Sequence, residues 1–189
     1  MAPERCRCYG FRFNRNRNTG TSVRAFAEWL YGTAPSVAIH STFWLIRLLQ
    51  ATHLLTAGVA VGSGLMIALR AIGWQRADQR FEAVWKRFAP WLAWSLAVMA
   101  ATGAAQTLGD PVREFTATSY WLKIALLLIC ALGTMLLGRT ARRAPQATEF
   151  SFAAKLAAAA LILGWLALPL LGRMIGYDVA IWGSWSLRT

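Results

Sequence analysis

The chain has 189 residues, the length of one domain, and 57% of them are hydrophobic, against about 45–50% in soluble domains. Charged residues make up only 15% and lie mainly between apolar runs, so the composition predicts a membrane protein. A formal net charge of +12 would suggest nucleic-acid binding in a soluble protein, but here the arginines flank apolar runs. Membrane topology and contact with anionic headgroups explain that placement, so we expect membrane lipids as partners and exclude nucleic acid.

Residues 1–22 are rich in arginine and asparagine and contain no apolar core. They predict a disordered basic tail, and neither a signal peptide nor a membrane span. A recognisable helical pattern begins only near Val23. This leaves open that the natural protein starts downstream of residue 1. From Val23 to about Trp29 the apolar residues recur at helical spacing, which predicts a short interfacial helix that Pro35 ends.

Four apolar runs follow, and each is long enough to cross a bilayer core of about 30 Å, which needs about 20 residues at 1.5 Å each. Arg70 closes the first run, and a Gly-Asp-Pro turn at 109–111 ends the second. The predicted fold is all-α, a four-transmembrane-helix bundle with a short amphipathic N-terminal helix, in a single domain over residues 23–189. The spans are predicted at about 43–69, 88–108, 119–138 and 152–172.

The loops predict how the chain sits in the membrane. The linker 70–87 carries five Lys or Arg residues against two acidic ones, and the loop 139–151 carries three against one. The middle loop 109–118 has one arginine against two acidic residues. Because an excess of Lys and Arg marks the cytoplasmic side, we expect a multi-pass protein of the bacterial inner membrane with both linkers inside and both termini outside.

A polar stripe marks the outer part of the first run. Arg47, Gln50 and His53 are three residues apart, so each lies about 60° from the next on a helix. Lys123 in the third run and Arg173 at the end of the fourth reach a similar depth. Ionisable groups at membrane depth are costly, so these cations either face the bundle or snorkel outward to lipid phosphates.

His53 is the only histidine within the four runs, and three interpretations of it stay open. It forms a structural hydrogen bond to another helix, it ligates a haem iron or a metal ion, or it belongs to a quinone or proton site. A bis-histidine haem needs a second histidine, but His40 precedes His53 by thirteen residues, about 20 Å along a continuous helix and on a different side. Met99 in the second run is the candidate sixth ligand, unless a second protomer supplies one.

Small residues continue along the first run. Gly58 and Gly62 have the G-x-x-x-G spacing, and Gly64 follows, so we expect neighbouring helices to approach closely here. The sequence contains no H-E-x-x-H, no G-x-S-x-G and no Gly-rich phosphate loop, and nothing in it indicates a hydrolytic or phosphoryl-transfer activity.

The leading functional prediction is a non-enzymatic subunit or accessory partner that associates with a membrane protein or with itself. The alternative is a redox or metal-handling module that binds haem b, copper or quinone. Its metal ligand would be His53, and its candidate cofactor contacts are His53, Gln50, Arg47, Lys123 and Met99. A small transporter would need further spans or an oligomer to form a path.

Several segments together resemble a known family. They are FAEWLYGTAPSVAI, LLQATHLLTAGVAVGSGLMIALRAIG, FAPWLAWSLAVMAATG and TSYWLKIALLL. Their order resembles a bacterial family of small four-helix inner-membrane proteins known only as a domain of unknown function, which implies the fold and the location but no activity. In that family the first span typically ends in Asp-Leu-Arg, whereas this chain has Ala68-Leu69-Arg70. The architecture is also distantly similar to copper-resistance-D-type and b-type cytochrome membrane modules.

Overall fold

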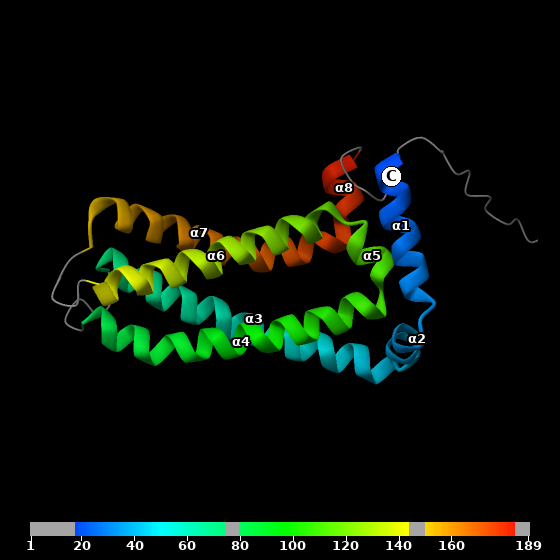
Figure 1. The fold of residues 1–189 in the computed structure, drawn as a ribbon, viewed down its shortest axis with the longest axis horizontal. Helices are drawn as coiled ribbons and strands as arrows, with labels where there is room; N and C mark the ends of the chain where they lie inside the picture. Colours follow the sequence, from blue (N-terminus) through cyan, green and yellow to red (C-terminus); the bar gives the residue numbers. More distant parts are fainter. Residues whose placement is uncertain (1–17, 75–79, 144–149, 184–189) are drawn as a thin grey trace, which may run out of the picture.

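The computed structural model describes residues 18–74, 80–143 and 150–183. Within these ranges the chain is helical and contains no strand, and four helices are long and apolar enough to cross a membrane. They are α3 (Phe43–Ile72), α4 (Phe81–Gly109), α6 (Thr118–Arg143) and α7 (Phe152–Met174). The predicted all-α, four-helix membrane bundle is confirmed (Figure 1). The protein is therefore a multi-pass membrane protein.

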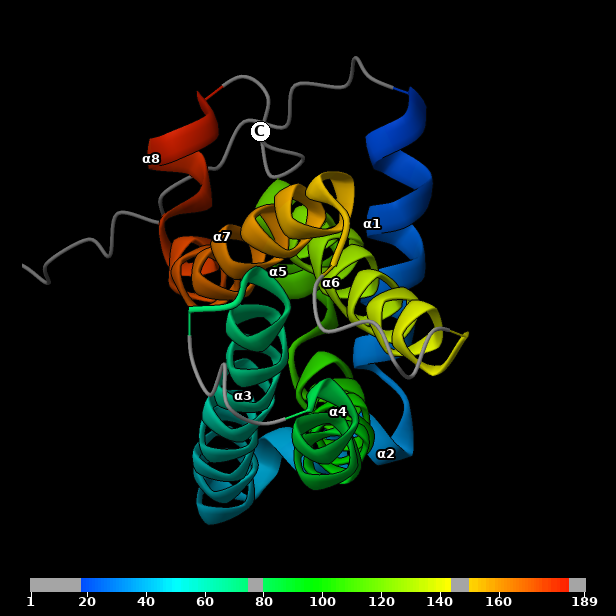
Figure 2. The ribbon, with the colours of Figure 1, turned by 90° about the vertical axis from the view of Figure 1, so that its left-hand side faces the viewer.

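The four long helices form two antiparallel hairpins. The α3–α4 hairpin lies against the α6–α7 hairpin, and Figure 2 shows the pairs as two layers. The contacts between the layers are made mainly by α3 and α7. Side chains also join α4 to α6 at both ends of the bundle, where Trp85 packs on Gly138 and Thr107 meets Tyr120. Of the described helices, α3 makes the most extensive contacts with the rest of the bundle.

Close packing at glycines explains why α3 and α7 lie together. The ring of Trp165 on α7 is fully buried against Gly64 of α3, in the space that a side chain at position 64 would fill. The Trp165 indole N–H donates to Thr134 Oγ1 on α6 at 3.2 Å, so the polar edge of the ring is satisfied. Without a hydrophobic driving force between helices in lipid, such contacts between small and large residues are what hold the helices together.

The three glycines of the predicted close-approach segment behave differently. Gly64 accommodates Trp165 as expected, but Gly58 and Gly62 are exposed, and a Cβ at either position would meet no atom within 4 Å. The difference follows from helical geometry, because Gly62 lies about 200° around the helix from Gly64. Of these glycines, only Gly64 takes part in packing within the described part of the chain.

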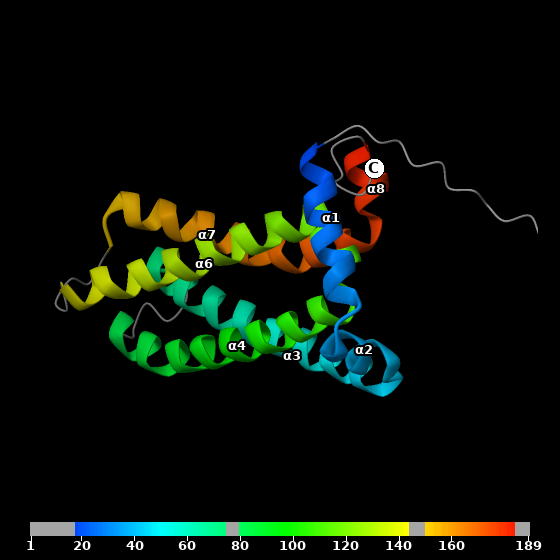
Figure 3. The same ribbon diagram turned by 45° about the vertical axis from the view of Figure 1, so that its right-hand side comes forward.

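Short helices gather at one end of the bundle, which we call the capped end; we call the opposite end, where residues 73–80 and 144–151 connect the helices, the loop end. The short helices are α1 (Asn18–Tyr31), α2 (Ala34–Ser41), α5 (Pro111–Phe115), the 3-10 helix η1 (Ile175–Tyr177) and α8 (Asp178–Trp182). Figures 1 and 3 show α1 running across the end of the bundle, beside α5. An N-terminal helix was predicted here, and the structure contains one that crosses the end of the bundle.

Two details of the N-terminal prediction differ from the structure. Residues 18–22 are helical, so the described part of the helix already extends five residues before the expected start. Residues 1–17 lie outside the described residues. Pro35 does not end α1, which stops at Tyr31, but stands in the first turn of α2, where its missing N–H costs nothing.

The segment after α7 turns back onto the start of α6. The Asp178 carboxylate is fully buried and accepts hydrogen bonds from the Ser119 N–H at 2.9 Å and the Ser119 hydroxyl at 2.7 Å. It also accepts from the Thr118 N–H at 3.3 Å, and the Trp182 indole donates to Ser119 Oγ at 2.8 Å. Asp178 therefore caps α6 from a distance of about sixty residues in sequence. Tyr177, directly before this cap, is exposed.

Candidate functional site

His53 lies between α3 and α4 in the half of the bundle nearer the capped end. Its Nδ1 atom lies 2.9 Å from Thr102 Oγ1 on α4. The ring packs over Gly103, where a Cβ would lie 3.3 Å from His53 Cε1, so the absence of a side chain makes room for the imidazole. The position of His53 thus depends on two neighbouring residues of α4, one small and one polar.

The hydrogen bonds of Thr102 indicate which ring nitrogen of His53 carries the proton. The Thr102 hydroxyl lies 2.8 Å from the Val98 carbonyl and 3.3 Å from the Met99 carbonyl of its own helix, and both accept its single proton. The Thr102 oxygen is therefore the acceptor for His53, and Nδ1 is the donor. In the neutral ring this leaves Nε2 as the nitrogen with a lone pair.

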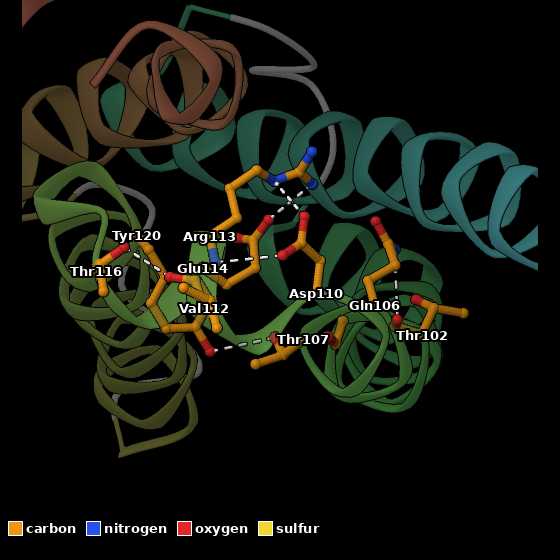
Figure 4. Close-up of polar contacts among 10 residues, drawn as sticks. Thr102, Gln106, Thr107, Asp110, Val112, Arg113, Glu114, Thr116 and Tyr120 are labelled. Carbon is orange, nitrogen blue, oxygen red and sulfur yellow. Dashed lines mark hydrogen bonds and ion pairs between the residues drawn. The ribbon is translucent and has the colours of Figure 1, made fainter. Parts of the chain in front are cut away.

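Further polar side chains extend from Thr102 toward the capped end. Gln106, one turn further along α4, donates to the Leu49 carbonyl of α3 at 3.5 Å and to the Thr102 carbonyl at 3.3 Å. Thr107 Oγ1 lies 3.4 Å from the Tyr120 hydroxyl on α6. Figure 4 shows the Gln106–Thr102 and Thr107–Tyr120 contacts and, beyond them, the polar contacts of α5.

Lys123 lies on the inward face of α6. Cys130 and Leu137 follow it at intervals of seven residues, which keeps all three on one side of the helix, and these two are only 1% and 5% exposed. The Lys123 side chain reaches Gly172 on α7, where a Cβ would lie 3.6 Å from Nζ. It interacts electrostatically with His53 of α3 and with Glu114 of α5. Of the two predicted alternatives for Lys123, the structure therefore favours a side chain that faces the bundle.

We call His53, Thr102, Gln106, Thr107, Tyr120 and Lys123 the polar cluster. It contains two of the residues that the sequence singled out, His53 and Lys123, and brings them into one region. The sequence did not single out the other four members, because one threonine, glutamine or tyrosine in an apolar run does not by itself indicate a site. A signal was present in the second span, where Thr102, Gln106 and Thr107 recur at helical spacing and form a polar face opposite His53.

The remaining candidate residues do not join the polar cluster. Arg47 is exposed, with its guanidinium carbon 4.3 Å from the centre of the Phe43 ring, and Gln50 is exposed as well. Arg173 is exposed and lies over Tyr177, 6.0 Å from the ring centre. The predicted polar stripe therefore does not form one site: His53 faces α4, whereas Arg47 and Gln50 face outward.

The surroundings of His53 limit which cofactors a single chain can hold. The Met99 side chain belongs to the apolar core, and the Met99 backbone is what lies beside the imidazole. His40 stacks on Tyr31 instead, with ring centres 4.5 Å apart. Within the described residues, no three His, Cys, Asp or Glu side chains come together in a group that could hold a metal ion. Among the described residues, neither Met99 nor His40 is therefore placed as a second ligand beside His53.

Comparison of the chain with protein-family models, with curated proteins and with solved structures found no match. The family resemblance drawn from the sequence stays a prediction.

Proposed function

We propose that this membrane protein is a non-enzymatic subunit that associates with a partner membrane protein or with a second copy of itself through the outward face of α3. The observation that carries this proposal is the exposure of Gly58 and Gly62. The glycines that pack within the bundle lie against side chains of other helices: Gly64, Gly133, Gly138 and Gly164 contact Trp165, Leu161, Trp85 and Cys130. Gly58 and Gly62 have the same chemistry, but no side chain of the described residues packs against them.

A partner helix would gain more from this face than lipid does. Two glycines one turn apart form a shallow groove in the helix surface, and a second backbone can approach it closely. Exposed Leu55 and Val59 border the groove, so the face is apolar throughout. A helix that packs here gains dispersion contacts along both edges, whereas mobile acyl chains fill such a groove less completely.

We further propose that the protein lies in the bacterial inner membrane with the capped end outside. The loop-end linkers carry the excess of Lys and Arg, which supports a cytoplasmic position for that end. The resemblance to a family of small four-helix inner-membrane proteins supports the same location.

The association is tested with Gly58→Ile and Gly62→Ile, measured by quantitative co-purification and by cross-linking in mild detergent. Both variants are expected to lose associated protein, because a branched side chain fills the groove. Ala97→Ile is the matched control, since Ala97 is exposed on α4. If all three variants keep the same associated chains as the unmodified protein, the α3 face is not the interface and the proposal fails.

A redox or metal-handling role at His53 is the second candidate, and one observation favours it. Histidines that bind a metal usually donate their other ring N–H to an oxygen, which fixes the ring. His53 has this arrangement through Thr102, with Nε2 as the remaining nitrogen. Absorption spectra of the purified protein, oxidised and dithionite-reduced, test it. A Soret band that His53→Ala abolishes would support a haem; featureless spectra together with a blank metal analysis would reject this role.

A further inference from the structure

A cavity of about 310 Å³ opens between α1 and α5 at the capped end. It is lined by Arg24 on α1 and by Asp110, Val112, Arg113 and Thr116 around α5, so three charged side chains border a surface that also includes apolar atoms. The cavity is separate from the polar cluster, whose members do not line it. We propose that this cavity binds the head group of a zwitterionic phospholipid.

The position of the cavity matches the head-group layer. The spanning helices run along the long axis of the molecule, and α1 crosses their end beside α5 (Figures 1 and 3). A cavity between these two helices therefore lies at the level where the hydrocarbon core gives way to phosphate and amine groups. A ligand that reaches it from the membrane brings its head group to this depth.

The charges at the cavity are mixed and are held by exposed pairs. Arg24 Nε lies 3.0 Å from Glu28 Oε1, and both side chains are about half exposed. Arg113 contacts Asp110 at 3.4 Å and Glu114 at 3.1 Å, as Figure 4 shows. Exposed ion pairs of this kind are weak, so a ligand with both charges can exchange partners with them at little cost.

Two opposite charges in one ligand suit this arrangement better than a single charge. The guanidinium groups of Arg24 and Arg113 are suited to a phosphate, because their planar donors match its oxygens. The Asp110 carboxylate, on the same cavity, is suited to the ammonium group. An anionic lipid offers the arginines the same phosphate but no ammonium group, so Asp110 would lose its ion pair with Arg113 without gaining a new partner.

An aromatic cluster next to the cavity provides contacts for the remainder of a lipid. Phe26 of α1 meets Phe115 of α5 with ring centres 6.0 Å apart, and Phe115 in turn meets Trp121 of α6 at the same separation. The Trp121 indole donates to the Phe115 carbonyl at 3.1 Å, which fixes that ring beside α5. Phe26 and Trp121 remain about half exposed. Aromatic rings at the membrane interface pack against the glycerol and upper acyl region of lipids.

The test is native mass spectrometry of the delipidated full chain, titrated separately with phosphatidylethanolamine and phosphatidylglycerol that carry identical acyl chains. The expected result is about threefold stronger retention of phosphatidylethanolamine, the ratio that one exposed charge pair supplies. The joint change Arg24→Gln and Arg113→Gln is expected to weaken retention of both lipids. Asp110→Asn is expected to remove the preference alone, and asparagine still caps α5.

The controls separate this site from general lipid binding. Arg47→Gln removes an exposed charge near the capped end but outside the cavity, and it is expected to leave the preference unchanged. Free glycerophosphoethanolamine at the same concentration is expected not to displace the lipid, because it lacks the part that contacts the aromatic cluster. Equal retention of both lipids by the unmodified chain, or a preference that survives Asp110→Asn, would overturn the proposal. Displacement by the free head group would show a soluble phosphate ligand instead of a lipid and would also overturn it.

Discussion

The two halves of the bundle are held together by different interactions. Toward the loop end, large apolar rings fill spaces over glycines, as Trp165 does over Gly64 and Trp85 over Gly138. Toward the capped end, hydrogen bonds between helices take over, from His53–Thr102 to Asp178 at the start of α6. Close packing tolerates little change in volume, whereas a polar site can accept a ligand in place of its own partners. We therefore expect substitutions toward the loop end to affect stability most, and we expect the candidate functional residues to lie toward the capped end.

The largest effect is expected where packing is closest. Gly64→Leu directs a side chain into the space of the buried Trp165 ring and is expected to lower the free energy of unfolding by about 3 kcal/mol or more. Gly62→Leu, on the exposed side of the same helix, is expected to change it by less than about 0.5 kcal/mol. Thermal unfolding of the dilute, monomeric protein in detergent compares the two. Equal losses would mean that Gly62 is packed inside the bundle after all.

A smaller loss is expected from the helix caps, which differ between the two ends. Asp178→Ala removes a fully buried carboxylate from the N–H groups of α6 and is expected to lower stability by about 2 kcal/mol. Ser151→Ala removes the local cap of α7 at the loop end, an exposed 3.3 Å bond to the Ala154 N–H, and should lower stability by about 0.5 kcal/mol. Denaturant titration measures both changes. A larger effect at Ser151 would contradict the role given to the C-terminal segment.

The hydrogen bond of His53 is expected to contribute about 1 kcal/mol. Thr102→Val keeps the shape of the side chain but removes the acceptor for His53 Nδ1. Besides the loss of stability, nitrogen NMR of the imidazole should show that the single tautomer gives way to a mixture. Thr140→Val is the control near the loop end, because the Thr140 hydroxyl donates to the Leu137 carbonyl of its own helix. An unchanged tautomer in Thr102→Val would show that something else fixes the ring.

The smallest effect on stability is expected at the two cations Lys123 and Arg173. Labelling at these two positions distinguishes a side chain that faces the bundle from one that is exposed. Lys123→Cys on the inward face of α6 should react slowly with a membrane-impermeant maleimide, whereas Arg173→Cys, exposed at the capped end, should react quickly. The labelling rates in intact vesicles also report on which side of the membrane the capped end lies. Equal rates at both positions would mean that Lys123 snorkels out of the bundle.

The architecture was predictable because its signals are local. Runs of about 20 apolar residues identify spans whatever their neighbours are, and all four predicted spans lie within the observed helices. The helix ends were less predictable. Residues 81–87 look like part of a basic linker, yet they form the first two turns of α4, because Phe81 and Val84 are buried against the bundle. Contacts with distant residues, and not local polarity, decide where such a helix begins.

The polar site was predictable only in part for the same reason. The charge and depth of His53 and Lys123 are visible in the sequence, and both residues face the bundle. Arg47 and Gln50 share the helical stripe of His53, but a stripe 120° wide meets a neighbouring helix on only one of its sides. Which side that is depends on where α4 lies, and the position of α4 is set by Gly103 and Thr102, some fifty residues further along the chain.

The sequence by itself determined that this chain crosses the membrane four times, because apolar length and the charges of loops act within single segments. Only the tertiary structure decided which glycines pack and which face outward, that Asp178 caps a helix some sixty residues away, and that α1 and α5 border an open pocket lined in part by charged side chains. These features depend on the rotation of each helix about its axis. That rotation is set by contacts between side chains far apart in the sequence, which no local pattern encodes.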